Sequence, residues 1–128
     1  WVVAELDKVV LPYHLDAAKQ LAGLLALDYV DEMRARVAAL VEERGRVEAA
    51  FDELGIEHWP SGANFVLFRV PGRSGEAVWQ QLLDRSILVR NCASWPRLDD
   101  CLRVTLGTRA EDDRFLAALG EIVQGAAP

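Results

Sequence analysis

The sequence predicts an α+β fold, in which helices cover a small, mostly antiparallel sheet of about three strands and long helices precede the sheet. Three features predict it. Apolar residues recur at helical spacing over residues 1–54, strand-like segments alternate with turns over residues 56–106, and a capped amphipathic helix follows. We expect residues 1–30 to form connecting helices and residues 31–128 to form the domain that contains the sheet.

The first part of the chain is predicted to be helical. Apolar residues lie at helical spacing over residues 1–10, and Pro12 ends this pattern, so residues 11–15 are predicted to be extended. Asp16 is the predicted N-cap of a second helix, which reaches Leu25.

The longest predicted helix runs from a cap at Asp28 to a C-terminal stop at Gly55. Its apolar residues are spaced mostly three and four positions apart, which is typical of a helix with one buried face. We expect this stripe to face the core: Val30, Met33, Val37, Leu40, Val47, Phe51 and Leu54.

The second half of the chain alternates strands with helices. Residues 56–59 are short and only β-like, whereas strands are predicted over residues 64–70, 87–90 and 101–106. A helix is predicted over residues 76–84, and Thr108 with Glu111 forms a capping box for the last helix. The predicted buried stripe of that last helix consists of Phe115, Leu116, Leu119, Ile122 and Val123.

Composition and charge exclude several classes of partner. The 128 residues carry 14 Lys and Arg against 20 Asp and Glu, a net charge of -6 that argues against nucleic-acid and anionic-lipid binding. No apolar run approaches the roughly 20 residues of a membrane helix. Cys92 and Cys101 are too few for a disulfide scaffold, so we expect buried thiols and a cytoplasmic location. The chain opens at Trp1 without a leader or Met, so we expect a piece of a longer protein.

Two arginines are the main candidates for binding chemistry. Alternation along residues 101–106 places Leu102, Val104 and Leu106 on the core face and therefore Arg103 on the opposite face. A solvated or ion-paired arginine fits this position, and so does a bidentate clamp for a carboxylate or phosphate. If the strand that ends at Arg90 pairs with this one, both guanidinium groups point into one open region and would attract a small anionic metabolite.

Other side chains carry weaker signals. His14 and His58 share no ligand spacing with a cysteine or carboxylate, so no metal site is expected. The sequence also lacks a glycine-rich phosphate loop and a nucleophile elbow. Trp59 and Trp79 are expected to pack in the core, and Trp95, in its loop, is a candidate for lining a pocket.

Four segments occur in a recognisable order: Leu11-Pro-Tyr-His-Leu15, Ser61-Gly-Ala-Asn-Phe-Val-Leu-Phe68, Ile87-Leu-Val-Arg90 and Cys101-Leu-Arg-Val-Thr-Leu-Gly-Thr108. Together they resemble the C-terminal third of the histidinol-phosphate aminotransferases, which are fold-type I pyridoxal-phosphate enzymes of the class I and II aminotransferases. The resemblance covers nearly the whole chain. The last segment is typical of the superfamily, whereas the first segment and the interval between Arg90 and Arg103 are more particular to the histidinol-phosphate branch.

The resemblance implies a role for each matching residue. Arg103 matches the arginine that grips the α-carboxylate of the amino-acid donor or keto-acid acceptor. Arg90 matches the arginine that holds the phosphate of histidinol phosphate. Asn64 and Phe65 match the strand at the edge of the small domain, with Asn64 a candidate for lining the site. Tyr13 matches a passage between the two domains and is a further candidate.

The chain departs from the family pattern at the cofactor. Family members bind pyridoxal 5'-phosphate through a lysine in a Ser-Lys stretch, and the only lysines here are Lys8 and Lys19, which lie on helical patterns. The resemblance implies a parent enzyme of histidine biosynthesis that converts L-histidinol phosphate and 2-oxoglutarate to imidazole-acetol phosphate and glutamate. Without the cofactor's lysine, we expect no catalytic residue in this chain and no transamination by the chain alone.

Two other interpretations stay open on the sequence. One is a stand-alone α+β module that binds anions or a partner without transaminase activity, and the other is a truncated or degenerate aminotransferase paralogue. The resemblance implies a homodimeric parent. The apolar faces of the first two helices also predict that this chain self-associates through residues 2–27.

Overall fold

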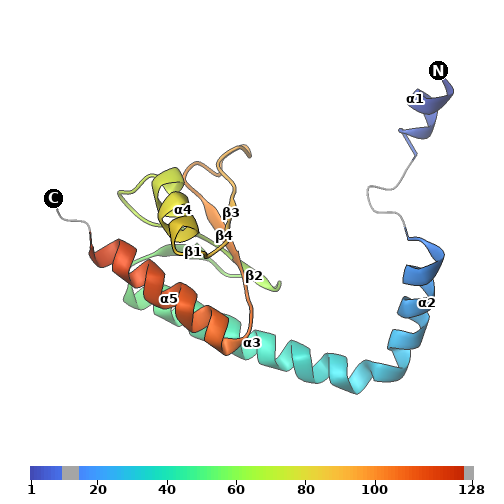
Figure 1. The fold of residues 1–128 in the computed structure, drawn as a ribbon, viewed down its shortest axis with the longest axis horizontal. Helices are drawn as coiled ribbons and strands as arrows, with labels where there is room; N and C mark the ends of the chain where they lie inside the picture. The colour runs from blue at the N-terminus through green and yellow to red at the C-terminus, as the bar shows by residue number, and fades with distance from the viewer. Residues whose placement is uncertain (10–14, 126–128) are drawn as a thin grey trace. The chain divides into compact units, whose positions relative to one another are not determined.

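A computed structural model describes residues 1–9 and 15–125 of the chain. The chain divides into two compact units, Trp1–Ala35 and Arg36–Pro128, which are described separately. The first unit is helical, and the second contains a sheet with its covering helices (Figure 1). The α+β class predicted from the sequence is confirmed.

The first unit contains helices α1 (Val2–Leu6), α2 (Ala17–Ala26) and the 3₁₀ turn η1 (Leu27–Tyr29). The predicted cap of α2 is confirmed, because the Asp16 carboxylate accepts a hydrogen bond from the Lys19 backbone N–H at 2.9 Å. Helix α1 is shorter than the predicted helix over residues 1–10. The extended passage predicted at residues 11–15 falls almost entirely outside the described residues.

Helix α3 (Val30–Glu53) is the longest element, and two predictions about it were wrong in part. Asp28 does not cap it, because Asp28 lies inside η1, whose flanking residues already have helical backbone angles. The apolar stripe is buried only in its second half, at Val47 and Phe51, while Met33 and Val37 are about half exposed. The predicted stop is confirmed at Gly55, whose φ of 68° favours glycine.

The sheet has four strands, one more than predicted, in the order β1-β2-β4-β3. They are β1 (Glu57–Trp59), β2 (Phe65–Arg69), β3 (Arg90–Asn91) and β4 (Leu102–Thr105), and each neighbouring pair is antiparallel. The extra strand is β1, where the sequence was only β-like. It pairs with β2 through the register His58 opposite Phe68.

Strand β3 is shorter than predicted and is displaced toward the C-terminus. Residues 87–89 are not part of the sheet, and pairing begins at Arg90. The Val89 carbonyl accepts a hydrogen bond from the indole N–H of Trp79 at 3.1 Å, and Ser86 has a φ of 60°. Helix α4 (Gly75–Asp84) therefore contacts the segment directly before β3 through the Trp79 side chain.

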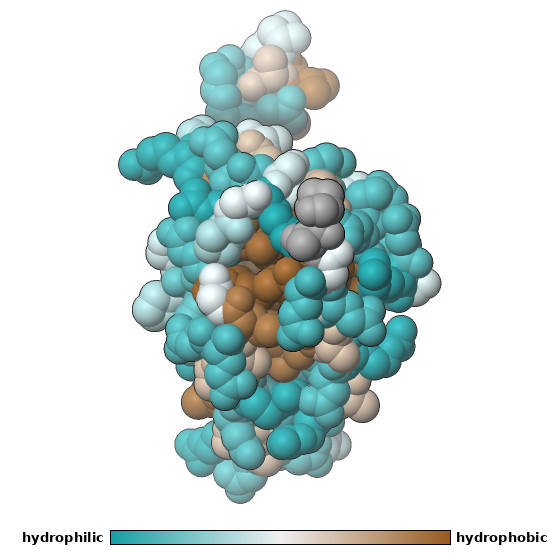
Figure 2. Space-filling view, turned by 90° about the vertical axis from the view of Figure 1, so that its left-hand side faces the viewer, coloured by the Kyte–Doolittle hydropathy of each residue, from teal (hydrophilic) through white to brown (hydrophobic). Residues whose placement is uncertain are grey.

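One face of the sheet packs against helices α3, α4 and α5 (Arg109–Gln124). Phe51, Phe68 and Phe115 form its centre, with ring centroids 5.1 to 6.1 Å apart. In the space-filling view, apolar atoms are visible in the middle of one face, surrounded by polar side chains (Figure 2). The buried core residues shared by strands and helices are Val47, Phe51, Val66, Phe68, Val78, Leu82, Leu102, Val104, Phe115, Leu119 and Ile122.

An ion pair and an N-terminal capping box fix the position of helix α5. The predicted capping box is confirmed, with the Glu111 carboxylate accepting from the Thr108 N–H at 2.8 Å. Arg46 on α3 pairs with Asp113 on α5 at 2.7 Å, so the two helices lie side by side as Figure 1 shows. Within the described ranges, no helix is long and apolar enough to cross a membrane.

Candidate functional site

The sheet face opposite the helices carries the two candidate arginines. The strand register places four residues in one row across the sheet: Trp59 on β1, Leu67 on β2, Arg103 on β4 and Arg90 on β3. Residues directly opposite each other in antiparallel strands point to the same face, with Cβ atoms about 4.5–5.5 Å apart. The structure therefore brings Arg90 and Arg103 together on one face.

Arg103 is half-buried beside an aromatic ring. Its guanidinium carbon Cζ lies over the Phe65 ring, 4.6 Å from the ring centroid. Its Nε atom is buried and has no hydrogen-bond partner, and in the described part of the chain no carboxylate forms an ion pair with its guanidinium. The positive charge of Arg103 is thus held in place by a ring and is not neutralised.

Arg69 on the same face provides a contrast. Its guanidinium binds both through Nε and Nη2 to a single carboxylate oxygen of Glu57, at 2.9 and 2.5 Å. This hydrogen bond and the negative charge of Glu57 raise the pKa of Arg69. Arg69 also lies 6.0 Å from the centroid of the Trp59 ring. The charge of Arg69 is therefore already paired with the Glu57 carboxylate.

Arg90 is exposed and begins strand β3. No acid within residues 1–9 or 15–125 forms an ion pair with it, and its Cα partner in the sheet is Arg103. Two adjacent guanidinium groups without a structural acid can bind one dianion or two separate anions.

The remaining predicted site residues are more scattered. Asn64 is exposed directly before β2, and its carbonyl accepts a hydrogen bond from the Leu106 N–H at 2.9 Å. Trp95 is exposed in the loop between β3 and β4. Tyr13 lies outside the described residues. The core position predicted for Trp59 was wrong, because Trp59 is 38% exposed on the outer face of the sheet.

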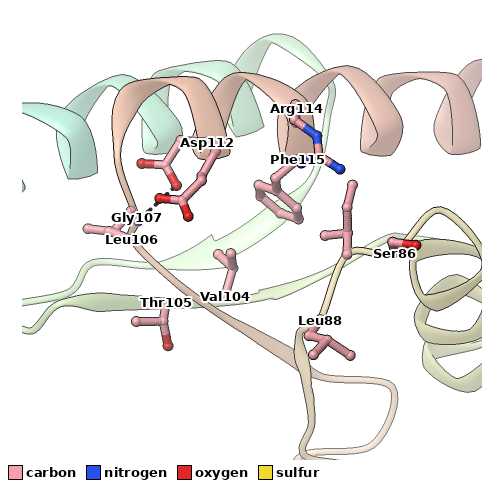
Figure 3. A pocket seen from close by; sticks show the side chains of 11 residues that line it. Ser86, Leu88, Val104, Thr105, Leu106, Gly107, Asp112, Arg114 and Phe115 are labelled. Atoms are coloured by element: carbon pink, nitrogen blue, oxygen red, sulfur yellow. Dashed lines mark hydrogen bonds between the residues drawn. The ribbon is translucent and has the colours of Figure 1, made fainter.

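A separate pocket of about 340 Å³ lies between α5, the end of β4 and residues 86–88 (Figure 3). Its wall includes Asp112, which is 2% exposed. The Oδ1 atom of Asp112 accepts a hydrogen bond from the Gly107 N–H at 3.0 Å, whereas Oδ2 has no partner. Burial raises the pKa of Asp112. Neither Arg90 nor Arg103 lines this pocket, so it is distinct from the arginine face.

The cysteines are buried thiols, as predicted. Cys92 and Cys101 lie on the strand-end segments that join β3 to β4, where the Cys92 N–H donates to the Cys101 carbonyl at 2.9 Å. Burial raises the pKa of both thiols, which makes them poor nucleophiles at neutral pH.

Both lysines of the chain are exposed in the first unit, Lys8 in the turn after α1 and Lys19 in α2. Lys8 pairs with Glu5 at 2.6 Å, and Lys19 pairs with Asp16 at 2.9 Å. Each ammonium group is therefore bound to a nearby acid at an exposed position, unlike a lysine prepared for covalent chemistry.

The sequence reasoning missed two side chains that shape these sites. Phe65 was matched only to an edge strand, although its alternation with Leu67 and Arg69 places it on the same face as Arg103. Asp112 was not singled out, although it lies three and four positions before Phe115 and Leu116 and so continues the predicted buried stripe of the last helix, unlike its exposed neighbour Asp113.

Comparison with known proteins identifies the family. The family model "Aminotransferase class I and II" matches residues 1–119. Histidinol-phosphate aminotransferase 2 of Nitrosococcus oceani is 36% identical over 119 residues, which is 91% of this chain and 33% of that protein. The chain spans about a third of the length of the curated relatives it matches.

Solved structures agree in fold. The histidinol-phosphate aminotransferase of Clostridium acetobutylicum has a TM-score of 0.81 and 25% identity, over 96% of this chain and 38% of that chain. The enzyme from Sinorhizobium meliloti, solved in complex with pyridoxal-5'-phosphate, has a TM-score of 0.66 and 29% identity, over 86% of this chain and 30% of that chain. The likeness therefore extends to sequence as well as topology. The chain belongs to the class I and II aminotransferase family, whose members use pyridoxal phosphate.

Proposed function

We propose that this chain supplies the substrate-binding domain of an aminotransferase that exchanges an amino group between L-histidinol phosphate and 2-oxoglutarate. The products would be imidazole-acetol phosphate and glutamate. The family match and the histidinol-phosphate aminotransferases among the relatives support the reaction class. The arginine face supports the assignment of the anionic substrate groups.

The observation that carries the proposal is the pairing of Arg90 with Arg103 across β3 and β4. Like charges directly opposite each other destabilise a sheet. Arg69 on the same face avoids this cost through Glu57, whereas the Arg90–Arg103 pair has no acid within the described residues. An anionic substrate would offset the repulsion, so the fold retains a charge cluster whose natural counterion is a ligand.

Arg103 is proposed to bind the α-carboxylate. It is held by a strand interior and a ring, so its two terminal nitrogens can match the two oxygens of a carboxylate. Arg90 is proposed to bind the phosphate of histidinol phosphate, because it is exposed and next to Arg103 and because a phosphate needs more room. Asn64, Trp95 and Tyr13 remain proposed lining residues.

The described residues do not fit as the covalent anchor of pyridoxal phosphate, since Lys8, directly after α1, and Lys19, in α2, are both exposed and ion-paired. When bound, that cofactor acts as the electron sink that makes loss of the substrate's α-proton feasible. We propose that this chain binds the anionic ends of the substrate, contains no catalytic residue and does not transaminate alone. Adding pyridoxal phosphate, glutamate and imidazole-acetol phosphate to the 128-residue chain should yield no 2-oxoglutarate.

The rest of the proposal concerns organisation. Residues 1–30 would be connecting helices and residues 31–128 the small domain of a cytoplasmic, homodimeric enzyme. This chain on its own would self-associate through the apolar residues of its N-terminal helices, several of which are exposed: Val2, Val3, Leu6, Leu21, Leu24 and Leu25.

The test of the proposed function is Arg103→Ala in the complete aminotransferase that carries this sequence. Loss of a charge-assisted contact worth about 1.5–3 kcal/mol should raise KM for glutamate and 2-oxoglutarate roughly 10- to 150-fold. Arg69→Ala is the matched control, because Arg69 lies on the same face but is paired with Glu57. An unchanged KM in Arg103→Ala, or equal increases in both variants, would reject the carboxylate role.

A further inference from the structure

An acidic side chain can orient the guanidinium group of an arginine. The acid then partly neutralises the positive charge and accepts hydrogen bonds from some of its N–H groups. Arg69 shows this arrangement here, with both its Nε and Nη2 donating to Glu57. Arg103 has a different support. Its guanidinium lies over the Phe65 ring at 4.6 Å, and no carboxylate in the described ranges is within ion-pair distance.

A ring constrains a guanidinium differently from an acid. Stacking fixes the plane of the group and covers one side of it, but it uses none of its N–H donors and leaves the charge unneutralised. The Nε atom of Arg103 is buried without a partner, so no hydrogen bond of Nε orients the group. Contact with the ring is the interaction left to fix its plane.

The Phe65 ring is itself attached to a well-fixed piece of backbone. The Phe65 carbonyl accepts a hydrogen bond from the Ser61 hydroxyl at 2.6 Å, and Phe65 is the Cα partner of Thr105. The preceding carbonyl, of Asn64, accepts the Leu106 N–H at 2.9 Å. Phe65 and Arg103 therefore sit on two strands whose relative position is fixed around the contact.

We propose that Phe65 is a positioning residue for substrate binding: its ring holds the Arg103 guanidinium flat, with both terminal nitrogens free to form a bidentate contact with a substrate carboxylate. This inference rests on the proposed function and extends it from the arginine to the group that orients it. It accounts for how an arginine without an acidic partner keeps one orientation while retaining its full charge for the ligand.

The first measurement is direct and needs no ligand. In the ¹⁵N-labelled 128-residue chain, the Arg103 Nε–Hε signal, assigned through Arg103→Lys, should be displaced by the ring current of Phe65 and should exchange slowly with water because Nε is buried. Phe65→Leu should abolish the displacement and speed the exchange. Phe65→Tyr, which keeps the ring, should preserve both. An unchanged signal in Phe65→Leu would overturn the proposal.

The second measurement titrates 2-oxoglutarate into the same variants. Loss of the cation–π contact should weaken 2-oxoglutarate binding roughly 2- to 30-fold in Phe65→Leu. Phe65→Tyr should bind 2-oxoglutarate with the affinity of the unsubstituted 128-residue chain. Arg69→Ala is the control for a general change of charge on this face. The melting temperature of each variant separates lost affinity from lost folding.

The outcomes separate this inference from the proposed function. If Arg103→Lys abolishes binding and Phe65→Leu leaves it unchanged, Arg103 binds the carboxylate but Phe65 does not position it. If Arg103→Lys leaves 2-oxoglutarate binding unchanged, Arg103 does not bind the carboxylate. The proposed role of Phe65 in substrate binding is then rejected as well, whatever the Nε signal shows. Weakened binding in Phe65→Leu with rescue in Phe65→Tyr supports both.

Discussion

Arg69 and Arg103 lie on the same face of the sheet, yet only Arg69 is paired with a carboxylate. The pair with Glu57 joins neighbouring strands β1 and β2, which is an ordinary cross-strand contact. Arg103 lies on the neighbouring strand β4 and rests against the Phe65 ring. The difference separates an arginine that stabilises the sheet from one that is available to a ligand, and it supplies a control for each substitution on this face.

Replacing Arg90 should change substrate preference. In the complete aminotransferase, Arg90→Ala should raise KM for histidinol phosphate roughly 10- to 150-fold through loss of a charge-assisted phosphate contact. KM for an unphosphorylated amino-acid substrate should change much less. Steady-state kinetics with both substrates measures the ratio, with Arg69→Ala as the control. Equal losses for the two substrates would reject the phosphate role of Arg90.

Replacing Asp112 should stabilise the fold in a pH-dependent manner. Burial raises the pKa of Asp112 above its ordinary value of 3.8, so the folded state binds more protons between the two values and stability falls as pH rises through that range. Asp112→Asn keeps an oxygen for the Gly107 N–H and removes the buried charge. We expect Asp112→Asn to raise the free energy of unfolding by about 1–2 kcal/mol at pH 8, and this gain should shrink toward pH 3.5.

Urea unfolding at both pH values measures this effect. The control is Asp113→Asn, since Asp113 is exposed and pairs with Arg46 at 2.7 Å, so its loss should weaken the fold slightly. A loss of stability in Asp112→Asn of similar size at pH 3.5 and pH 8 would contradict the assigned cost of the buried carboxylate.

Gly75→Ala should destabilise the second unit. A Cβ atom on Gly75 would lie 2.6 Å from both Cα and the carbonyl oxygen of Asp100, and backbone must move to relieve that contact. We expect a loss of about 1–3 kcal/mol, measured by thermal or urea unfolding. Gly45→Ala is the matched control, because Gly45 is inside α3 with open space around it. Alanine there should raise the free energy of unfolding, by about 1 kcal/mol at most. Equal effects of both substitutions would show that the contact with Asp100 is unimportant.

Self-association is predicted to depend on the apolar side chains of α2. Leu21 and Leu24 are 58% and 66% exposed, and their replacement by glutamine should shift the 128-residue chain toward monomer in sedimentation experiments. Leu88→Gln is the control, since Leu88 is an exposed leucine outside this helix. If the unsubstituted 128-residue chain stays strictly monomeric at high concentration, the prediction is wrong.

Local features of the chain were predictable from the sequence, because they depend on neighbouring residues. Asp16 caps α2 and Thr108 with Glu111 caps α5, since a side chain within three positions can reach a free N–H. Period-two alternation correctly placed Leu102 and Val104 in the core and Arg103 on the opposite face. The family resemblance also came from the sequence, through short segments in a characteristic order.

Other features depend on contacts between segments distant in the chain, and only the tertiary structure decided them. The Trp79 indole donates to the Val89 carbonyl directly before β3, and the register between β3 and β4 places Arg90 opposite Arg103. The helix periodicity that buries Phe51 equally predicts burial of Met33, which is exposed, because a periodic stripe says which residues share a face and not what covers it. The register between strands and the cover on each face are long-range choices, and no local pattern contains them.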